Sequence, residues 1–493
     1  TPQAANKTMG QGGFQEVEQM NLFKDMVCYQ EEVRDPSRMA EVLNRVIEKA
    51  FRGSAPAQIN VPRDYWTQVI DIDLPPIVRF ERQGGGEEAV NKAASILSKA
   101  KFPVILSGAG VVIGNAIEEC KMLAERLDAP VCNGYQHNDS FPGSHPLAVG
   151  PLGYNGSKAA MQLISKADVV LALGTRLNPF STLPGYGIDY WPKNATIIQV
   201  DMNPDRIGLT KKVTVGICGD CKMVAKQISD KLSKDAGNDG REERKNLIHK
   251  TKSAWLQTLT GLDHEEDDPG TVWNKEARER DKDRMSPRQA WRAIQEAIPT
   301  GAIISSDIGN NCAIGNAYPT FEEGRKYLAP GLFGPCGYGF PSILGAKIGC
   351  PETPVIGFAG DGAFGISMNE MSSCARKEWP AITMVIFRNY QWGAEKRNSI
   401  LWFDDNFVGT ELDPELSYAK VANACGLKGV TVKTMEETTK AIKQSCEDQK
   451  KGITTFIEII LNQELGEPFR RDAMKKPVKV AGINKEDMKT QSV

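Results

Sequence analysis

The sequence Val355-Ile356-Gly357-Phe358-Ala359-Gly360-Asp361-Gly362 decides the fold of the C-terminal part of the chain. Its first five residues predict a buried strand, and a Gly-Asp-Gly triplet follows that strand directly. A second apolar run, residues 382–387, is followed closely by Asn389. We expect a helix over 366–378 to join the two strands as a parallel βαβ unit, which brings both strand ends to one edge of a sheet.

That edge is predicted to hold a divalent cation. The carboxylate of Asp361 and the side-chain carbonyl oxygen of Asn389 would be offered to one point. Mg²⁺ prefers such oxygen ligands, and a backbone carbonyl and diphosphate oxygens would complete its shell. The flanking glycines let the backbone approach phosphate groups, and the following helix N-terminus adds N–H donors. A lone triplet would be no more than a turn, but its combination with the second strand end favours a functional site.

Strands alternate with helices through most of the chain, which predicts α/β architecture with three doubly wound parallel-sheet domains. Strands are expected at 57–61, 103–107, 168–173, 195–200, 302–306, 355–359, 382–387 and 454–460, with helices at 36–52, 87–100 and 115–127. The expected segments are the C-terminal part of a first domain (1–70), a linker (71–86), a middle Rossmann-like domain (87–230), a charged, solvated linker with some helix (231–285), the domain of the triplet (286–462) and a tail that could form a lid (463–493).

The first domain is expected to be incomplete at its N-terminus. Residues 36–61 have the pattern of one helix followed by one strand, with no sheet ahead of them. A single unit of this kind cannot bury both of its faces. We therefore expect a further segment ahead of Thr1.

Composition excludes several classes of protein. The 60 Lys and Arg nearly balance the 62 Asp and Glu, so no large charge favours nucleic acid or an acidic membrane. No apolar run has the length of a membrane span and no signal peptide is visible, so a cytoplasmic location is expected. The 11 scattered cysteines suit reduced thiols, and Cys218-Gly219-Asp220-Cys221 is interpreted as a turn before a helix.

Gly-Asp-Gly followed by Asn some two dozen residues later resembles the signature of thiamine-diphosphate-dependent enzymes. The order of domains resembles the acetolactate-synthase-like family, in which pyrimidine-binding, middle and diphosphate-binding domains follow one another. The resemblance implies that Asp361, Asn389 and the backbone carbonyl of Gln391 hold Mg²⁺. The residues implied to contact thiamine diphosphate are Gly309, Asn310, Asn311, Gly334, Cys336, Gly360, Asp361, Gly362, Ala363, Asn389, Gly393 and Ala394.

One of these positions departs from the family pattern. The segment Gly334–Pro341 resembles the loop that meets the aminopyrimidine ring, where position 336 usually carries a bulky apolar residue that holds the cofactor bent. Cys336 is a small hydrophobe and would form a thinner wedge.

The resemblance also implies residues of the first domain. The glutamate that activates the cofactor in this family has no match in the chain and is expected upstream of Thr1, so the chain as written is expected to be inactive alone. Phe14-Gln15-Glu16 resembles a stretch that faces the substrate, and Gln15 would serve the cofactor of a partner subunit. A homodimer or homotetramer with active sites between subunits is implied.

The blocks Tyr390–Asn398 and Gly466–Pro477 resemble a branch of the family that converts sulfoacetaldehyde and phosphate to acetyl phosphate and sulfite, through an enamine formed on the cofactor, in the catabolism of taurine and other sulfonates. Two anions must then be held near the cofactor, a task that suits basic side chains. The candidates are Lys396, Arg397, Arg470 and Arg471, and the alternative for each is a solvated surface charge.

Two other functions stay open at this stage: a carboligase like acetolactate synthase, and a cofactor-binding fragment or relative without catalysis. Gly108-Ala109-Gly110 after a predicted strand is half of a dinucleotide fingerprint. Relatives use this middle domain for flavin or adenine nucleotide, but we expect it to be structural here.

Overall fold

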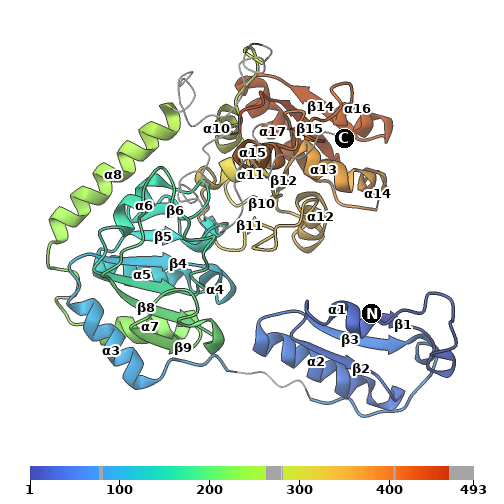
Figure 1. Ribbon diagram of the computed structural model, residues 1–493, viewed down its shortest axis with the longest axis horizontal. Helices are drawn as coiled ribbons and strands as arrows, with labels where there is room; N and C mark the ends of the chain where they lie inside the picture. Colours follow the sequence, from blue (N-terminus) through green and yellow to red (C-terminus); the bar gives the residue numbers. More distant parts are fainter. Residues whose placement is uncertain (77–80, 262–278, 280, 377, 403–406, 466–493) are drawn as a thin grey trace, which may run out of the picture. The chain divides into compact units, whose positions relative to one another are not determined.

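The computed structural model describes residues 1–76, 81–261, 279, 281–376, 378–402 and 407–465. The chain divides into two compact units, Thr1–Arg82 and Gln83–Val493. The first unit contains one parallel sheet and the second contains two, each accompanied by helices (Figure 1). This confirms the predicted α/β class, while the boundaries drawn at 70, 86, 230, 285 and 462 stay predictions.

The first unit is built on a three-stranded parallel sheet of order β1-β3-β2. Its elements are β1 (Pro2–Gln3), α1 (Gln19–Phe23), β2 (Tyr29–Glu32), α2 (Met39–Gly53) and β3 (Ala57–Pro62). Helix α2 packs its buried residues Val42 and Val46 on the sheet. The sequence pattern predicts only α2 and β3, and the expectation of no other strand is wrong. Strand β2 escapes prediction because its residues are polar and none of them is fully buried.

The second unit begins with a six-stranded parallel sheet of order β6-β5-β4-β7-β8-β9. Its strands are β4 (Pro103–Ser107), β5 (Val131–Asn133), β6 (Ala148–Pro151), β7 (Val169–Leu173), β8 (Thr196–Asp201) and β9 (Val215–Cys218). Its helices are α3 (Glu87–Ser98), α4 (Ala109–Ile113), α5 (Ile117–Leu127), α6 (Lys158–Ile164) and α7 (Cys221–Lys231). Cys218 ends β9 and Cys221 begins α7, so the predicted turn before the helix consists of Gly219 and Asp220, and the Asp220 side chain caps α7 by accepting from the backbone N–H groups of Lys222 and Met223.

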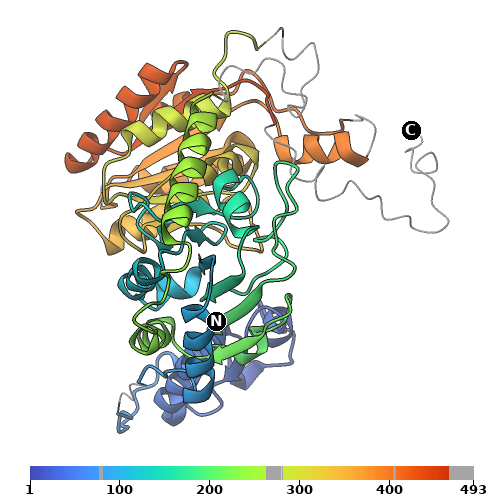
Figure 2. The ribbon, with the colours of Figure 1, turned by 90° about the vertical axis from the view of Figure 1, so that its left-hand side faces the viewer.

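The long helix α8 (Arg241–Gly261) runs past both sheets of this unit (Figures 1 and 2). Ile248 packs into the middle core, whereas Trp255 and Leu259 pack into the C-terminal one. The expected linker with some helix contains α8, but Arg244 is only 2% exposed, so the expectation that this segment is solvated is wrong at this position. Its guanidinium donates to the carbonyls of Lys101, Leu127, Asp128, Gly237 and Asp239.

The C-terminal sheet has six parallel strands in the order β11-β10-β12-β13-β15-β14. The strands are β10 (Ile303–Ser306), β11 (Tyr327–Leu328), β12 (Val355–Gly360), β13 (Thr383–Arg388), β14 (Lys428–Val432) and β15 (Thr455–Ile460). The helices are α10 (Pro287–Ala297), α11 (Asn310–Ile314), α12 (Gly339–Gly349), α13 (Asp361–Ser367), α14 (Met371–Cys374), α15 (Gly393–Trp402), α16 (Tyr418–Ala424) and α17 (Met435–Lys450).

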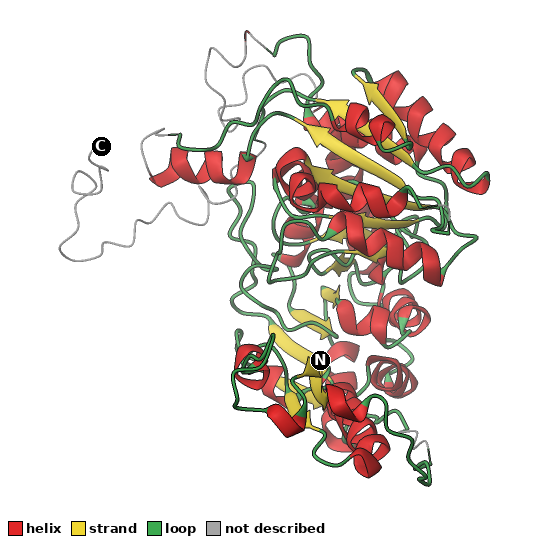
Figure 3. Ribbon diagram, turned by 90° about the vertical axis from the view of Figure 1, so that its right-hand side faces the viewer, coloured by secondary structure: helices red, strands yellow, loops and turns green. Residues whose placement is uncertain are grey.

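Both faces of this sheet are buried, and helices cover each of them (Figure 3). Successive side chains of β12 enter opposite cores, since Ile356 and Phe358 pack with α10 and α17 whereas Val355 and Ala359 pack with α12 and α13. Continuous apolar runs are typical of strands buried in this way. Among the described helices, none has both the length and the hydropathy that crossing a bilayer would need.

The helix predicted over 366–378 is wrong in its bounds. Helix α13 begins at Asp361, directly after β12, and a short 3₁₀ turn (Met368–Glu370) separates it from α14, which ends at Cys374. Gly362 and Gly365 hide this start from a sequence pattern because glycine has low helix propensity. The Gly-Asp-Gly triplet therefore belongs to a strand-to-helix junction.

Replacing Arg244 by Met should destabilise the second unit, because it leaves the buried carbonyls around that side chain without a donor. The expected loss is about 3 kcal/mol of unfolding free energy, measured by urea unfolding followed by circular dichroism. Lys245→Met, at the exposed neighbouring position, is the control and should change the unfolding free energy by less than about 0.5 kcal/mol. Equal effects of the two substitutions would contradict the anchoring role of Arg244.

Candidate active site

The carboxyl ends of β10, β12 and β13 lie side by side at one edge of the C-terminal sheet. Ser306 pairs with Phe358, and Gly360 pairs with Phe387. The residues that follow these strands are Asp307, Asp361 and Asn389, and each is at most 2% exposed. The βαβ reasoning from sequence therefore brings Asp361 and Asn389 together correctly.

Asp361 is a buried carboxylate with a fixed orientation. Its Oδ2 accepts from Arg388 Nη1 at 3.1 Å and from the backbone N–H of Tyr390 at 2.6 Å, while Oδ1 accepts from the backbone N–H of Gly362 at 3.0 Å. Burial raises the pKa of Asp361 to about 6, and the Arg388 charge only partly opposes this effect. A cation bound at Oδ1 would favour the ionised form.

Arg388 is a site residue that the sequence reasoning missed. It is 1% exposed and forms ion pairs with two carboxylates, since its Nη1 lies 3.1 Å from Asp361 Oδ2 and its Nε lies 3.9 Å from Glu458 Oε1. Its Nη2 donates to the carbonyls of Leu416, at 3.0 Å, and Asp413. The available signal is a charged residue at the end of an otherwise apolar strand, which is costly to bury unless it is paired.

Several polar side-chain atoms at this edge are buried and have no hydrogen-bond partner within the described part of the chain. They are Asn389 Oδ1, Gln391 Oε1, Asn310 Nδ2 and Asn311 Oδ1. Such atoms are rare in folded proteins and indicate a ligand or ion that supplies the missing partner. Oxygens suit a hard cation such as Mg²⁺, and the amide N–H groups suit phosphate oxygens.

The loops that carry these residues approach one another closely. A Cβ added to Gly393 would lie 3.2 Å from Asn310 Nδ2, and one added to Gly360 would lie 4.0 Å from Asn311 Nδ2. At Gly362 a Cβ would meet the Trp392 ring at 2.8 Å, so only glycine fits there. Helices α11, α13 and α15 all begin at this edge, and their N-terminal ends favour a negatively charged group.

The backbone of Gln391 suits the role given to its carbonyl. Gln391 forms an antiparallel bridge with Glu411, in which Trp392 N donates to Thr410 O and Leu412 N donates to Tyr390 O. In a pair of this kind, the central residue points its own N–H and C=O away from the partner strand. Its carbonyl is thereby directed away from residues 410–412.

Asp307 organises the neighbouring loop and was also missed as a site residue. Its carboxylate accepts from the backbone N–H groups of Ile308, Gly337 and Gly339 at 2.8, 3.1 and 2.6 Å. These contacts hold the segment that contains Gly334 and Cys336, the predicted contacts of the aminopyrimidine ring. Cys336 is half-buried, and burial raises the pKa of its thiol.

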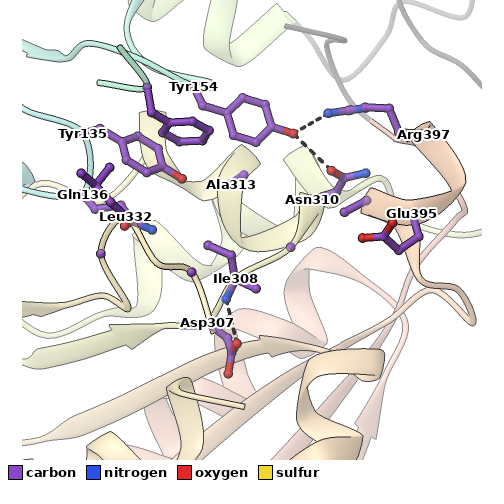
Figure 4. Close-up of a pocket in the computed structure, with 15 residues that line it drawn as sticks. Tyr135, Gln136, Tyr154, Asp307, Ile308, Asn310, Ala313, Leu332, Glu395 and Arg397 are labelled. Atoms are coloured by element: carbon purple, nitrogen blue, oxygen red, sulfur yellow. Dashed lines mark hydrogen bonds between the residues drawn. The ribbon is translucent and has the colours of Figure 1, made fainter. Parts of the chain in front are cut away.

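A cavity of about 240 Å³ opens beside these loops. The middle domain contributes Tyr135, Gln136, Tyr154 and Phe180 to its wall, and the C-terminal domain contributes residues 307–310, Ala313, Gly331, Leu332, Gly334, Ala394, Glu395 and Arg397 (Figure 4). The sequence reasoning assigned none of the middle-domain residues, because an aromatic residue after a strand carries no motif. The cavity therefore lies between the two domains of the second unit.

The basic residues proposed from the sequence separate in space. Arg397 is 3% exposed and lines the cavity, where its Nη1 donates to the Tyr154 hydroxyl. Lys396 does not line it, because its ammonium group pairs with Glu411 and donates to Gln463 Oε1 at 3.2 Å. Arg470 and Arg471 lie outside the described residues. Gln15 lies in the first unit, in a left-handed backbone conformation with φ of 60°.

The Gly108-Ala109-Gly110 loop packs closely against Gly174, the residue that follows β7 of the same sheet. The N–H of Gly110 donates to the carbonyl of Gly174 at 2.9 Å, and a Cβ on Gly108 would lie 2.6 Å from the same oxygen. These glycines serve close backbone packing, which supports a structural role for the loop.

The chain matches two protein-family models. One is "Thiamine pyrophosphate enzyme, central domain", over residues 90–228, and the other is "Thiamine pyrophosphate enzyme, C-terminal TPP binding domain", over residues 307–459. Among solved structures, benzoylformate decarboxylase from Polynucleobacter necessarius aligns with a TM-score of 0.74 at 20% identity, over 94% of this chain and 82% of that one. That likeness supports the fold alone.

Curated relatives are much closer in sequence. A "Probable sulfoacetaldehyde acetyltransferase" of Rhizobium meliloti is 77% identical over 100% of this chain and 83% of the relative. The "Sulfoacetaldehyde acetyltransferase" of Roseovarius nubinhibens is 75% identical over 100% of this chain and 82% of its own length. A "Probable acetolactate synthase large subunit" of Methanococcus aeolicus is 27% identical over 90% of this chain and 74% of its length.

Proposed function

The chain belongs to the sulfoacetaldehyde acetyltransferase family of thiamine pyrophosphate enzymes, and from this we propose that it converts sulfoacetaldehyde and phosphate to acetyl phosphate and sulfite. Its cofactors are thiamine diphosphate and Mg²⁺. The observation that carries the cofactor assignment is the group of buried, unpartnered amide atoms at the carboxyl edge of β10, β12 and β13. The cavity beside that edge supplies the space in which a small substrate can react.

We infer that Asp361 Oδ1, Asn389 Oδ1 and the Gln391 carbonyl hold Mg²⁺. All three are oxygen donors, as this hard cation requires, and Asp361 and Asn389 are buried at adjacent strand ends. Gly309, Asn310, Asn311, Gly360, Gly362, Ala363, Gly393 and Ala394 would surround the diphosphate, and Gly334 and Cys336 would meet the pyrimidine ring. The close approach of these loops supports that assignment.

When bound, thiamine diphosphate supplies a carbon nucleophile and an electron sink at the carbonyl of the substrate. In the overall reaction the carbon–sulfur bond breaks and sulfite leaves with its electron pair. The aldehyde carbon is oxidised to the acyl level while its neighbour becomes a methyl group, so no external oxidant is needed. The new bond joins the acyl carbon to a phosphate oxygen.

The protein's own residues set the conditions for this chemistry. Asp307 holds the 334–339 loop in place, and Arg388 with the Tyr390 N–H fixes the orientation of Asp361. The cavity wall includes the buried rings of Tyr135 and Tyr154, which keep bulk water away and strengthen the electrostatic interactions of the anions inside.

We further propose that the protein acts in the cytoplasm as a homodimer or homotetramer, with active sites between subunits and with Gln15 serving a partner subunit's cofactor. The balanced charge supports a protein that binds small molecules and not nucleic acid or membrane. Large apolar side chains exposed on the first unit, such as Phe14, Phe51 and Trp66, support a subunit contact there.

The reaction is tested with the full-length protein supplied with thiamine diphosphate, Mg²⁺, phosphate and sulfoacetaldehyde. We expect sulfite and acetyl phosphate in equal amounts, with acetyl phosphate formation dependent on phosphate. Pyruvate is offered in a parallel reaction as the substrate of a carboligase. Acetolactate from pyruvate without any sulfite from sulfoacetaldehyde would contradict the proposal and assign carboligase chemistry to the same cofactor site.

Replacing Asn389 by Ala should weaken Mg²⁺ binding to the protein loaded with thiamine diphosphate by about tenfold or more, because one buried oxygen ligand is lost. Isothermal titration with Mg²⁺ measures this directly. In the unsubstituted protein the affinity should fall as the pH drops below about 6, since burial raises the pKa of Asp361 to about 6 and a proton on that carboxyl competes with the cation.

Asn423→Ala is the control for this experiment, because it removes an exposed amide of the same domain, far along the chain from the strand ends. It should leave the Mg²⁺ affinity unchanged. An unchanged dissociation constant in Asn389→Ala, or one that does not depend on pH between 5 and 7, would overturn the metal assignment.

A further inference from the structure

A hydrogen-bonded chain crosses the interface between the two domains at the cavity (Figure 4). Arg397 Nη1, from α15, donates to the hydroxyl of Tyr154, and that hydroxyl donates to Asn310 Oδ1 at 3.2 Å. Tyr154 belongs to the middle domain, whereas its two partners belong to the C-terminal domain. The Tyr154 hydroxyl therefore orients the Arg397 guanidinium and the Asn310 side-chain amide at the same time.

The orientation of the amide follows from this contact. Because Asn310 Oδ1 accepts from Tyr154, its Nδ2 is turned the other way, towards the position where a Gly393 side chain would begin, 3.2 Å distant. Nδ2 is buried and has no partner in the described part of the chain. Tyr154 thus presents an N–H donor to the predicted diphosphate side and keeps the guanidinium on the cavity side.

Tyr154 is itself held rigidly. Its backbone carbonyl accepts from Asn316 Nδ2 at 3.1 Å, and its ring packs edge-on against Phe180, which packs in the same way against Tyr135. These rings form one small apolar cluster with Ala313 of the C-terminal domain. The hydroxyl therefore has little freedom to leave Arg397.

The chemistry of the cavity favours an oxyanion. The Arg397 guanidinium has a planar fork of N–H donors that matches sulfonate or phosphate oxygens, and its contact with the Tyr154 hydroxyl holds it at the cavity wall. Gln136 adds a buried amide to the cavity wall. Among the described residues of the wall, the carboxylates are Glu395 and Asp307, and the oxygens of Asp307 accept three backbone N–H groups. About 240 Å³ is room for a group of a few non-hydrogen atoms.

We propose that Tyr154 positions Arg397 as the receptor for a tetrahedral oxyanion, either the sulfonate of the aldehyde substrate or the phosphate that accepts the acetyl group. The identity of the anion rests on the proposed function, whereas the assignment of Arg397 as an anion receptor rests on the contacts at the cavity wall. The middle domain then forms part of the active site, through a positioning residue for which no sequence motif exists.

The test compares Tyr154→Phe, Arg397→Met and Arg397→Lys with Lys396→Met in the holoenzyme. The last is a matched control, since Lys396 is the adjacent buried cation on the same helix and does not line the cavity. Equilibrium binding of inorganic phosphate and of 2-hydroxyethanesulfonate, a sulfonate that carries an alcohol in place of the aldehyde, is measured by titration calorimetry. Thermal unfolding confirms that each variant is folded, and KM and kcat are measured for each substrate.

We expect Arg397→Met to lower the affinity for one of the two anions at least tenfold. Arg397→Lys should restore part of that affinity, because lysine supplies a point charge without the planar fork. Tyr154→Phe should lower the affinity for the same anion about three- to tenfold. It should also raise the KM of the substrate that carries this anion more than it lowers kcat. Lys396→Met should leave both affinities unchanged. The anion affected identifies the ligand as sulfonate or phosphate.

Unchanged affinities for both anions in Arg397→Met, or an equal loss in Lys396→Met, would overturn the receptor. A loss in Arg397→Met that is absent from Tyr154→Phe would overturn the positioning role of the tyrosine. Failure of the proposed function is distinguishable, because anion binding is measured without turnover. If the variants change anion binding but the protein releases no sulfite, the proposed anion receptor is supported and only the proposed reaction is contradicted.

Discussion

Polar groups buried without protein partners at the carboxyl edge of the C-terminal sheet are the constraint on which the site depends. Asn389, Asn310 and Asn311 each bury an amide atom that nothing in the described chain pairs. Leaving such a group unpaired costs about 1–3 kcal/mol, so a ligand that pairs these atoms would stabilise the edge. The ion pair with Arg388 fixes Oδ2 of the Asp361 carboxylate, while Oδ1 accepts only from the backbone N–H of Gly362 among the described residues.

The middle domain is tied to the C-terminal domain by hydrogen bonds across their interface. Asp139 Oδ2 accepts from the backbone N–H groups of Lys326 and Tyr327, and Asn138 Nδ2 donates to the carbonyls of Asn316 and Pro319. Desolvation raises the pKa of Asp139, as expected for a carboxylate held inside an interface. These contacts help to set the position from which Tyr154 reaches the cavity, so the proposed anion receptor depends on the packing between the two domains.

Much of the fold can be predicted from the sequence because the buried parallel strands are continuous apolar runs. Strands β4, β12, β13 and β15 lie within one or two residues of the predicted ranges. The polar strand β2 and the glycine-containing start of α13 could not be predicted, since their stability comes from tertiary contacts and not from local pattern. At the site, the spacing of Gly-Asp-Gly and Asn389 identifies the edge. Arg388, Asp307 and Tyr154 act through hydrogen bonds to residues distant in sequence, which no local motif encodes.

The position of the divalent cation tests the central claim most directly. Crystals of the full-length protein grown with thiamine diphosphate and Mn²⁺, which replaces Mg²⁺ and scatters anomalously, would locate the metal without reference to activity. We predict an anomalous peak at the ends of β12 and β13, at a coordination distance of roughly 2 Å from Asp361 Oδ1, Asn389 Oδ1 and the Gln391 carbonyl. A peak elsewhere, or an Asn389 side chain turned away from it, would contradict the account.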